Sequence, residues 1–309
     1  MNVMPFCEKR TTVVTQFVRR LRGGAQSILA QAGDGLFYVV KFAGNPQGEN
    51  LLFNESAGAE LYRACGLNTP SWKPLLLTDA FLDRNPQCWF QTETGLVKPT
   101  AGLCFGSSFL GDESTRLFEI LPEGSFNRIR NQVSFWLAWL VDICAEHADN
   151  RQALFLEDAR RRLDAYFVDQ GHLFGGPKGN RRVHFVASRY LDFRVYPNIS
   201  STHLLDFSRN LGALNLDALG ARIRNLPDEW MFGSALDSFQ RCLNRLSDSV
   251  LLQNLLETIV PSVARRTDFE QSAPHHCRAP EPGVLRSGVQ PRIQTLNSIG
   301  HRVCHPVCD

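Results

Sequence analysis

Residues 39 to 55 read VVKFAGNPQGENLLFNE, and this stretch decides how the chain is expected to fold. The apolar run Phe37–Val40 is typical of a strand and ends at Lys41, where Gly, Asn and Pro residues indicate a turn. Over Asn50–Cys65 the apolar residues recur at mostly helical spacing. The stretch therefore predicts a strand, a turn and a helix, with a lysine at the strand end and Glu55 in the helix.

The residues before this stretch predict more strands. Three β-branched or aromatic runs, TVVTQFVRRL, QSILAQA and LFYVVKF, are separated by Gly23-Gly24 and by Gly33-Asp34-Gly35. The Gly-Asp-Gly triplet favours a tight hairpin, because glycine adopts positive φ at little cost. The other break, Gly23 to Ser27, is a looser loop that could cover a ligand. A small antiparallel meander is expected here.

Further along, the character of the chain changes from strands to helices. Residues 72 to 105 contain short strand-like pieces punctuated by Pro and Gly, and two runs around 153–155 and 165–168 predict a hairpin. Helical spacing recurs over 126–145, 201–213, 217–224 and 235–256. We expect an α+β fold with an N-terminal antiparallel sheet and one helix in 1–105, a mainly helical part in 106–264 and a mostly disordered tail in 265–309.

Composition excludes several classes of protein. The 309 residues carry a net charge of only +2, which gives no reason to expect direct nucleic-acid binding. The longest apolar run, Val133 to Cys144, is shorter than the roughly 20 residues that cross a bilayer, and no secretory signal is visible. Nine scattered cysteines favour reduced, buried thiols over a disulfide framework. A cytoplasmic protein without a membrane segment is expected.

Three groups of polar residues could carry chemistry. A carboxylate of the helix, Glu55 or Glu60, could hold the Lys41 ammonium toward phosphate oxygens. Asp169 ends an apolar run and precedes a Gly, which suits a magnesium ligand. Asp149 lies in a polar loop after an apolar helix. Each also has an ordinary explanation: a solvated strand end, an Asx-turn and a capped loop, respectively.

The order of these features favours a functional interpretation over the ordinary explanations. A glycine loop, a strand lysine, a helix glutamate and two aspartates follow one another along the chain. In VVKFAGNPQGENLLFNE, LYRACGLNTP and VDQGHLFGG the chain resembles the HipA-like kinases, a branch of the protein-kinase-like superfamily, from about Thr12 to about Leu256. The resemblance implies a two-lobed kinase-like fold. It also implies that the substrate is ATP, the metal magnesium and the acceptor a Ser or Thr hydroxyl, with a protein as the expected carrier of that hydroxyl. A DNA-binding antitoxin is a possible partner.

The resemblance also implies roles for single residues. Lys41 would contact the nucleotide phosphates, Glu55 would orient Lys41, and Gly23, Gly24 and Ser27 would lie in the phosphate-covering loop. Asp169 would bind magnesium, and Asp149 would be the catalytic base or the residue that orients the acceptor hydroxyl.

One position departs from the family pattern. Such kinases usually have Asn five residues after the catalytic Asp, where this chain has Leu154. Gln152, or Asn150, could supply the missing amide oxygen. The alternatives are therefore a pseudokinase that binds nucleotide or a protein partner, or an unrelated α+β protein.

Overall fold

The computed structural model describes residues 11–111, 115–179, 188–259 and 285–286. In the N-terminal part, five strands close into a barrel in the order β1-β2-β3-β7-β4. These strands are β1 (Thr12–Arg20), β2 (Ile28–Ala32), β3 (Phe37–Lys41), β4 (Trp72–Leu77) and β7 (Gly102–Ser108). The short helix α2 (Asp79–Arg84) and the hairpin β5 (Phe90–Thr92) and β6 (Gly95–Val97) precede β7.

The N-terminal sheet differs from the predicted meander in how it closes. The pairings β1–β2, β2–β3, β3–β7 and β4–β7 are antiparallel, as expected, but β1 and β4 pair in parallel. Helix α1 (Leu51–Ala64) lies between β3 and β4 in the chain and returns it so that β4 can run beside β1. The expected boundary at residue 105 falls inside β7, which continues to Ser108.

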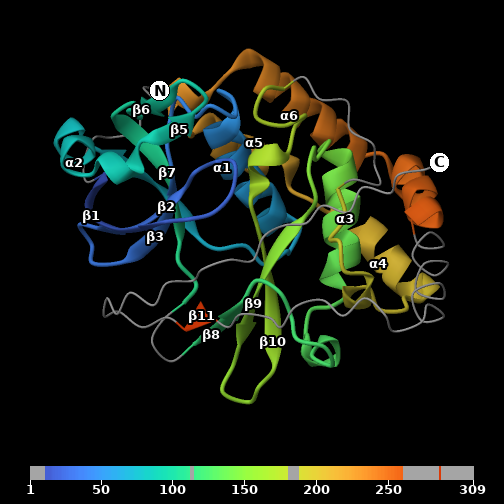
Figure 1. Ribbon diagram of the computed structural model, residues 1–309. Coiled ribbons are helices and arrows are strands. Elements are labelled where there is room, and N and C mark those ends of the chain that lie inside the picture. The colour runs from blue at the N-terminus through green and yellow to red at the C-terminus, as the bar shows by residue number, and fades with distance from the viewer. Residues whose placement is uncertain (1–10, 112–114, 180–187, 260–284, 287–309) are drawn as a thin grey trace, which may run out of the picture.

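The C-terminal part is mainly helical and contains a second small sheet (Figure 1). Its helices are α3 (Ser134–Cys144), α4 (Ser201–Gly212), α5 (Leu216–Arg224), α6 (Gly233–Leu246) and a helix over 249–259. Its sheet has the order β10-β9-β8-β11, with β8 (Arg116–Phe118), β9 (Gln152–Glu157), β10 (Leu163–Val168) and β11 (Leu285–Arg286). The predicted α+β class and the β9–β10 hairpin are confirmed.

Two helix predictions were wrong in their bounds, and the predicted tail is only partly described. The helix expected over 126–145 begins at Ser134, after a short 3-10 turn at Phe126–Arg128. The helix expected over 235–256 breaks at Asp248, whose Oδ1 accepts from the N–H groups of Val250 and Leu251 and so starts a new helix. Within the tail only residues 285–286 are described, where β11 pairs with β8; the rest lies outside the described residues.

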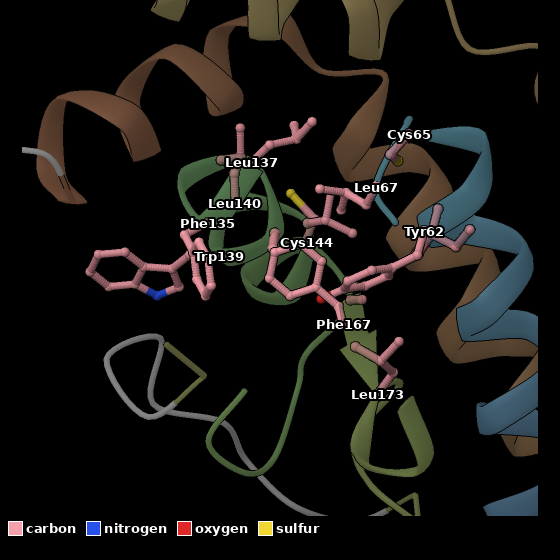
Figure 2. Packing of buried hydrophobic residues seen from close by; sticks show 14 of the residues in the cluster. Tyr62, Cys65, Leu67, Phe135, Leu137, Trp139, Leu140, Cys144, Phe167 and Leu173 are labelled. Carbon is pink, nitrogen blue, oxygen red and sulfur yellow. The ribbon is translucent and has the colours of Figure 1, made fainter. Parts of the chain in front are cut away.

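Helix α1 lies between the barrel and the helices of the C-terminal part (Figure 1). All its residues from Leu51 to Tyr62 are buried. Figure 2 shows Tyr62 and Leu67 facing the side chains of α3 and of Phe167 from β10. A helix that is covered on every side must pair its polar side chains inside the protein. Asn54 and Glu55 are buried polar residues of α1, so their side chains must have partners inside the protein.

Helix α1 packs closely against the turn that follows β10, and glycine permits this approach. A Cβ built on Gly58 would lie 2.6 Å from both Gln170 Cβ and Leu173 Cδ1. Real Cβ atoms do not approach that closely, so a side chain here would push the helix and the turn apart. None of the described helices is long and apolar enough to cross a membrane.

Replacing Gly58 by Ala is therefore expected to lower the free energy of unfolding by about 1–3 kcal/mol, the usual cost of overpacking. Gly212, at the end of α4, provides the control, because a Cβ added there would meet no atom within 4 Å. Gly212→Ala should leave stability unchanged or raise it, since Ala is the better helix former. Urea unfolding measures both, and equal effects would contradict the close packing.

Candidate functional site

Lys41 joins three segments that are far apart in the sequence. Its Nζ makes an ion pair with Glu55 Oε1 of α1, and lies 2.5 Å from Asp169 Oδ1, directly after β10. Lys41 and Glu55 are buried, whereas the Asp169 carboxylate is partly open to solvent. Glu60, the other candidate, instead accepts from the indole N–H of Trp72 at 3.0 Å and from Arg222 at 3.1 Å.

The ion pairs decide the charge of this site. Burial alone would lower the pKa of Lys41, but Asp169 and Glu55 outweigh it and raise that pKa, so the ammonium stays charged. Burial likewise disfavours ionised Asp169, yet the adjacent Lys41 ammonium holds the Asp169 pKa well below its usual range. Burial raises the pKa of Glu55, the most enclosed of the three. Two carboxylates then share one ammonium, which leaves a net negative charge when both are ionised.

Asp169 occupies a strained turn that α1 clamps. Its backbone is left-handed, at φ 61° and ψ 59°, which few residues other than Gly, Asn and Asp adopt readily. The Asn54 amide donates to the carbonyls of Gly171 (3.0 Å) and Leu173 (2.8 Å), while the N–H of Gly171 donates to Glu55 Oε1 (2.7 Å). The helix that holds Lys41 through Glu55 therefore also fixes the position of Asp169.

The loop that carries Asp149 runs beside this turn. Three backbone hydrogen bonds join them, from Ala148 N–H to His172 O (2.8 Å), from Phe174 N–H to Ala145 O (2.6 Å) and from Gly175 N–H to Glu146 O (3.1 Å). Asp149 Oδ2 lies 4.0 Å from His172 Nε2, and the Asp149 side chain is about half exposed. Both predicted aspartates thus belong to neighbouring loops, with Asp149 on the solvent side.

Strained backbone gathers in these two loops. Glu146 and Phe174 have positive φ angles of 52° and 56°, as Asp169 does at 61°. Such residues cost free energy of order 1–3 kcal/mol each and cluster at functional sites, where the surrounding structure compensates for them. The loops are therefore built to hold particular side chains in place.

Gln152 reaches Asp169 across the β9–β10 hairpin. The register pairs Val168 with Gln152, so Gln152 lies beside the residue that follows Val168. Its Nε2 donates to Asp169 Oδ2 at 2.9 Å. Leu154, at the position where the family has Asn, lies two residues further along β9. The side-chain amide next to Asp169 is therefore that of Gln152. For Asn150, the backbone N–H donates to Asp149 Oδ1 at 2.8 Å.

The glycine loop lies beside Lys41 at the same end of the barrel. Ile28 pairs with Val40, which brings Ser27 next to Lys41 across the two strands. Gly23, with φ 121°, and Gly24 precede it, and the loop is closed by a bond from Leu21 N–H to Ser27 O at 2.8 Å. A Cβ on Gly24 would overlap the Gln47 side chain.

Two side chains tether this loop from either side. The Gln26 amide pairs with the backbone of Gln91 on β5, donating to its carbonyl at 2.9 Å and accepting from its N–H at 2.7 Å. Asn45, in the turn after β3, donates to Ala25 O at 2.8 Å. The loop is thus held in one shape before any ligand arrives.

The donor set near Asp169 fits a magnesium ion that is shared with phosphates. Within residues 11–111, 115–179, 188–259 and 285–286, no three or more His, Cys, Asp or Glu side chains gather into a group that could hold a metal ion. Magnesium usually keeps several waters and binds one or two carboxylates plus substrate phosphates. The Asp169 carboxylate supplies one such oxygen ligand, and the negative charge suits a cation, whereas the neighbouring Gln152 amide presents its Nε2 to Asp169.

Sequence reasoning identified Lys41, Glu55 and Asp169 but overlooked the residues that position them. Asn54 was part of the quoted motif, yet its clamp on residues 171 and 173 needs the tertiary fold. Asn45 was part of the same quoted stretch, and Gln26 lies inside the predicted glycine loop. Their bonds to Ala25 and to Gln91 on β5 also need the tertiary fold.

Comparison with known proteins yields structural likenesses alone. No family model matches the chain, and no curated protein matches it. The crystal structure of the Golgi casein kinase is similar at 13% identity and a TM-score of 0.47, over 82% of this chain and 75% of that one. The Golgi casein kinase with Mn/ADP bound is similar at 13% identity and a TM-score of 0.43, over 83% of this chain and 75% of that one.

Removing the Lys41 ammonium should destabilise the protein strongly near neutral pH. Lys41→Met leaves two carboxylates facing each other, which costs about 3–5 kcal/mol for a broken buried pair. Their pKa values would then exceed the unfolded values, so the variant should lose stability as pH rises through them and regain it on acidification. In the wild type the pKa of Asp169 is lowered, which has the opposite effect. The stability that the ionised Asp169 carboxylate contributes is lost as pH falls through that pKa.

Urea unfolding at pH 7 and pH 5 measures this difference. Lys73→Met is the control, because Lys73 makes a more exposed pair with Asp34. Exposed pairs contribute about 0–1 kcal/mol. A Lys41→Met variant as stable as the control, or equally affected at both pH values, would contradict the described charge arrangement.

Loosening the glycine loop should weaken binding of a ligand beneath it. Gln26→Ala removes two hydrogen bonds to Gln91, each worth about 0.5–1.5 kcal/mol, so nucleotide affinity should fall by roughly 5- to 150-fold. Gln31→Ala on β2 is the control, since Gln31 donates within its own hairpin, to Gly35 O. Calorimetric titration with ATP compares them, and equal affinities would show that the tether does not shape the loop.

Proposed function

We propose that this chain binds magnesium and ATP between the barrel and the helical part and transfers the γ-phosphate to a hydroxyl group. The observation that carries the proposal is the buried Lys41, shared by Glu55 of α1 and Asp169 after β10. A lysine oriented by a helix carboxylate and facing a metal-binding aspartate is the arrangement that kinase-like sites use for phosphates. The preformed glycine loop beside Lys41 supports it independently.

Each side chain has a separate task in the proposed reaction. Lys41 contacts the phosphates of the nucleotide, and Glu55 keeps its ammonium directed toward them. Backbone N–H groups of the loop from Gly23 to Ser27, which ends beside Lys41 across the two strands, would contact phosphate oxygens as well. Magnesium, held by Asp169 and by the Gln152 amide oxygen after rotation of that amide, would neutralise charge on the phosphates.

Asp149 receives the proton of the acceptor. The hydroxyl oxygen forms a bond to the γ-phosphorus while the bond from that phosphorus to the bridging oxygen breaks, and ADP leaves. The hydroxyl proton passes to the Asp149 carboxylate. The exposure of Asp149 supports an acceptor that approaches from solvent, such as a Ser or Thr side chain of a protein.

A second candidate is a pseudokinase that binds the nucleotide without transferring phosphate. Leu154 favours it, because the usual amide ligand of a second metal ion is absent from that position. The contact from Gln152 to Asp169 favours the active form instead, since it puts an amide beside the metal-binding carboxylate. The HipA-like family, a protein acceptor, an antitoxin partner and a cytoplasmic location stay predictions.

Binding and transfer should separate in single variants. Wild-type protein should bind ATP with magnesium and become phosphorylated or phosphorylate an added protein. Asp149→Asn should keep ATP affinity within about twofold and lose about 10²–10⁴-fold in transfer rate, as expected for loss of a general base. Asp169→Asn should lose the gain in affinity that magnesium provides. Calorimetry and radiolabelled phosphate transfer measure both.

Asp158→Asn, in the hairpin between β9 and β10, is the matched control for these aspartates, and it should change neither quantity. Binding by wild type without transfer would select the pseudokinase. The absence of ATP binding would refute both forms of the proposal.

A further inference from the structure

Arg151 is an almost fully buried cation directly before Gln152, and its contacts are made inside the protein. Its Nε and Nη2 donate to the two carboxylate oxygens of Asp142, on α3, at 2.8 and 2.7 Å. Both side chains have at most 1% of their surface exposed. The pairing with Asp142 raises the pKa of Arg151, against the effect of burial, so the guanidinium stays charged.

The remaining guanidinium nitrogen is directed at the end of β10. Arg151 Nη1 donates to Val168 O at 2.8 Å and lies 3.5 Å from Asp169 O. These two carbonyl groups lie immediately before and after the Cα atom of Asp169, whose backbone is left-handed. The guanidinium therefore contacts the main chain of the very residue whose carboxylate meets Lys41.

Helix α1 contacts the buried pair of Arg151 and Asp142 through Tyr62. Tyr62 donates its hydroxyl to Asp142 Oδ1 at 2.5 Å, and its ring lies 4.9 Å from the centre of the Arg151 guanidinium. The ring also packs edge-on against Phe167 of β10, at 5.8 Å, which Figure 2 shows next to it. Arg151 is thus enclosed by α1, α3 and β10, and these elements leave it little freedom to move.

A buried ion pair of this kind seldom adds stability over well-packed apolar side chains, because both charges lose their hydration. A charged guanidinium, however, supplies hydrogen-bond donors that apolar side chains lack. An apolar residue at position 151 could fill the space, but it could not donate to the carbonyls of Val168 and Asp169.

We propose that Arg151 is a positioning residue for the metal site, acting through the backbone of Asp169 and through the adjacent Gln152. The guanidinium, locked by Asp142 and Tyr62, holds the β10 end so that the Asp169 carboxylate stays beside the Gln152 side chain, whose Nε2 donates to Asp169 Oδ2 at 2.9 Å. This inference rests on the proposed function, in which these two side chains bind magnesium. The inference adds Arg151 as the charged side chain that keeps the Asp169 and Gln152 side chains next to each other.

Arg151→Lys tests the inference, because Lys keeps the charge but cannot donate to Asp142 and to Val168 O with the same fixed geometry. Partners behind metal ligands typically contribute 10- to 100-fold to metal affinity. We expect manganese affinity of the ATP-bound protein, measured by electron paramagnetic resonance, to fall by that factor. Metal-free ATP binding, which depends on Lys41 and the glycine loop, should change less than about twofold in calorimetry.

Two further variants keep the test decisive. Arg130→Lys is the matched control, since Arg130 also forms a two-bond pair, with Asp164 of β10, but on the surface. It should leave both affinities unchanged. If Arg151→Lys does not fold, the double variant Asp142→Leu with Arg151→Met removes both charges together and should fold with the same loss of metal affinity.

The outcomes separate the inference from the function on which it rests. Wild-type protein that gains no ATP affinity from a divalent metal would overturn the proposed function and the inference with it. A wild type that does gain affinity, with folded Arg151 variants that bind metal as tightly, would overturn the inference alone. Equal losses of metal-free and metal-dependent binding would also overturn it, because they indicate general damage to the fold.

Discussion

The ammonium of Lys41, buried between Glu55 and Asp169, is the constraint on which the rest of the site depends. One cation cannot satisfy two carboxylates unless β3, α1 and the turn after β10 meet at one point. Desolvating three charges is costly, so this meeting point must be held by packing and by further hydrogen bonds. The resulting negative balance is the charge that the proposed divalent cation would neutralise.

Helix α1 supplies most of that support. It is buried along Leu51–Tyr62, and its successive turns present Asn54 and Glu55 to the Asp169 turn, Gly58 to Gln170, and Tyr62 to Asp142. A shift of this helix would therefore disturb Lys41, the Asp169 turn and the buried Asp142–Arg151 pair together. The left-handed backbone at Asp169 is held by the contacts of Asn54 and Glu55 with the residues that follow it.

Much of this arrangement could be predicted from local sequence. Strand β3, the turn after it and α1 have clear periodicity and turn residues, and the order of Lys41, Glu55 and Asp169 marked the site. The parallel closure of β1 on β4 could not be foreseen, because strand partners depend on the whole barrel. Arg151 read as one more polar loop residue; its burial follows only from the meeting of α1, α3 and β10.

The position of Gln152 could be predicted only in part. Its amide was a candidate substitute for the absent Asn, but only the register of the β9–β10 hairpin puts it beside Asp169. A crystal structure grown with magnesium and a non-hydrolysable ATP analogue tests the central claim most directly. We predict phosphates on Lys41 under the Gly23-Gly24 loop, with the ion between them and Asp169. A nucleotide bound elsewhere, with the contact between Lys41 and Asp169 intact and no ion beside it, would contradict the account.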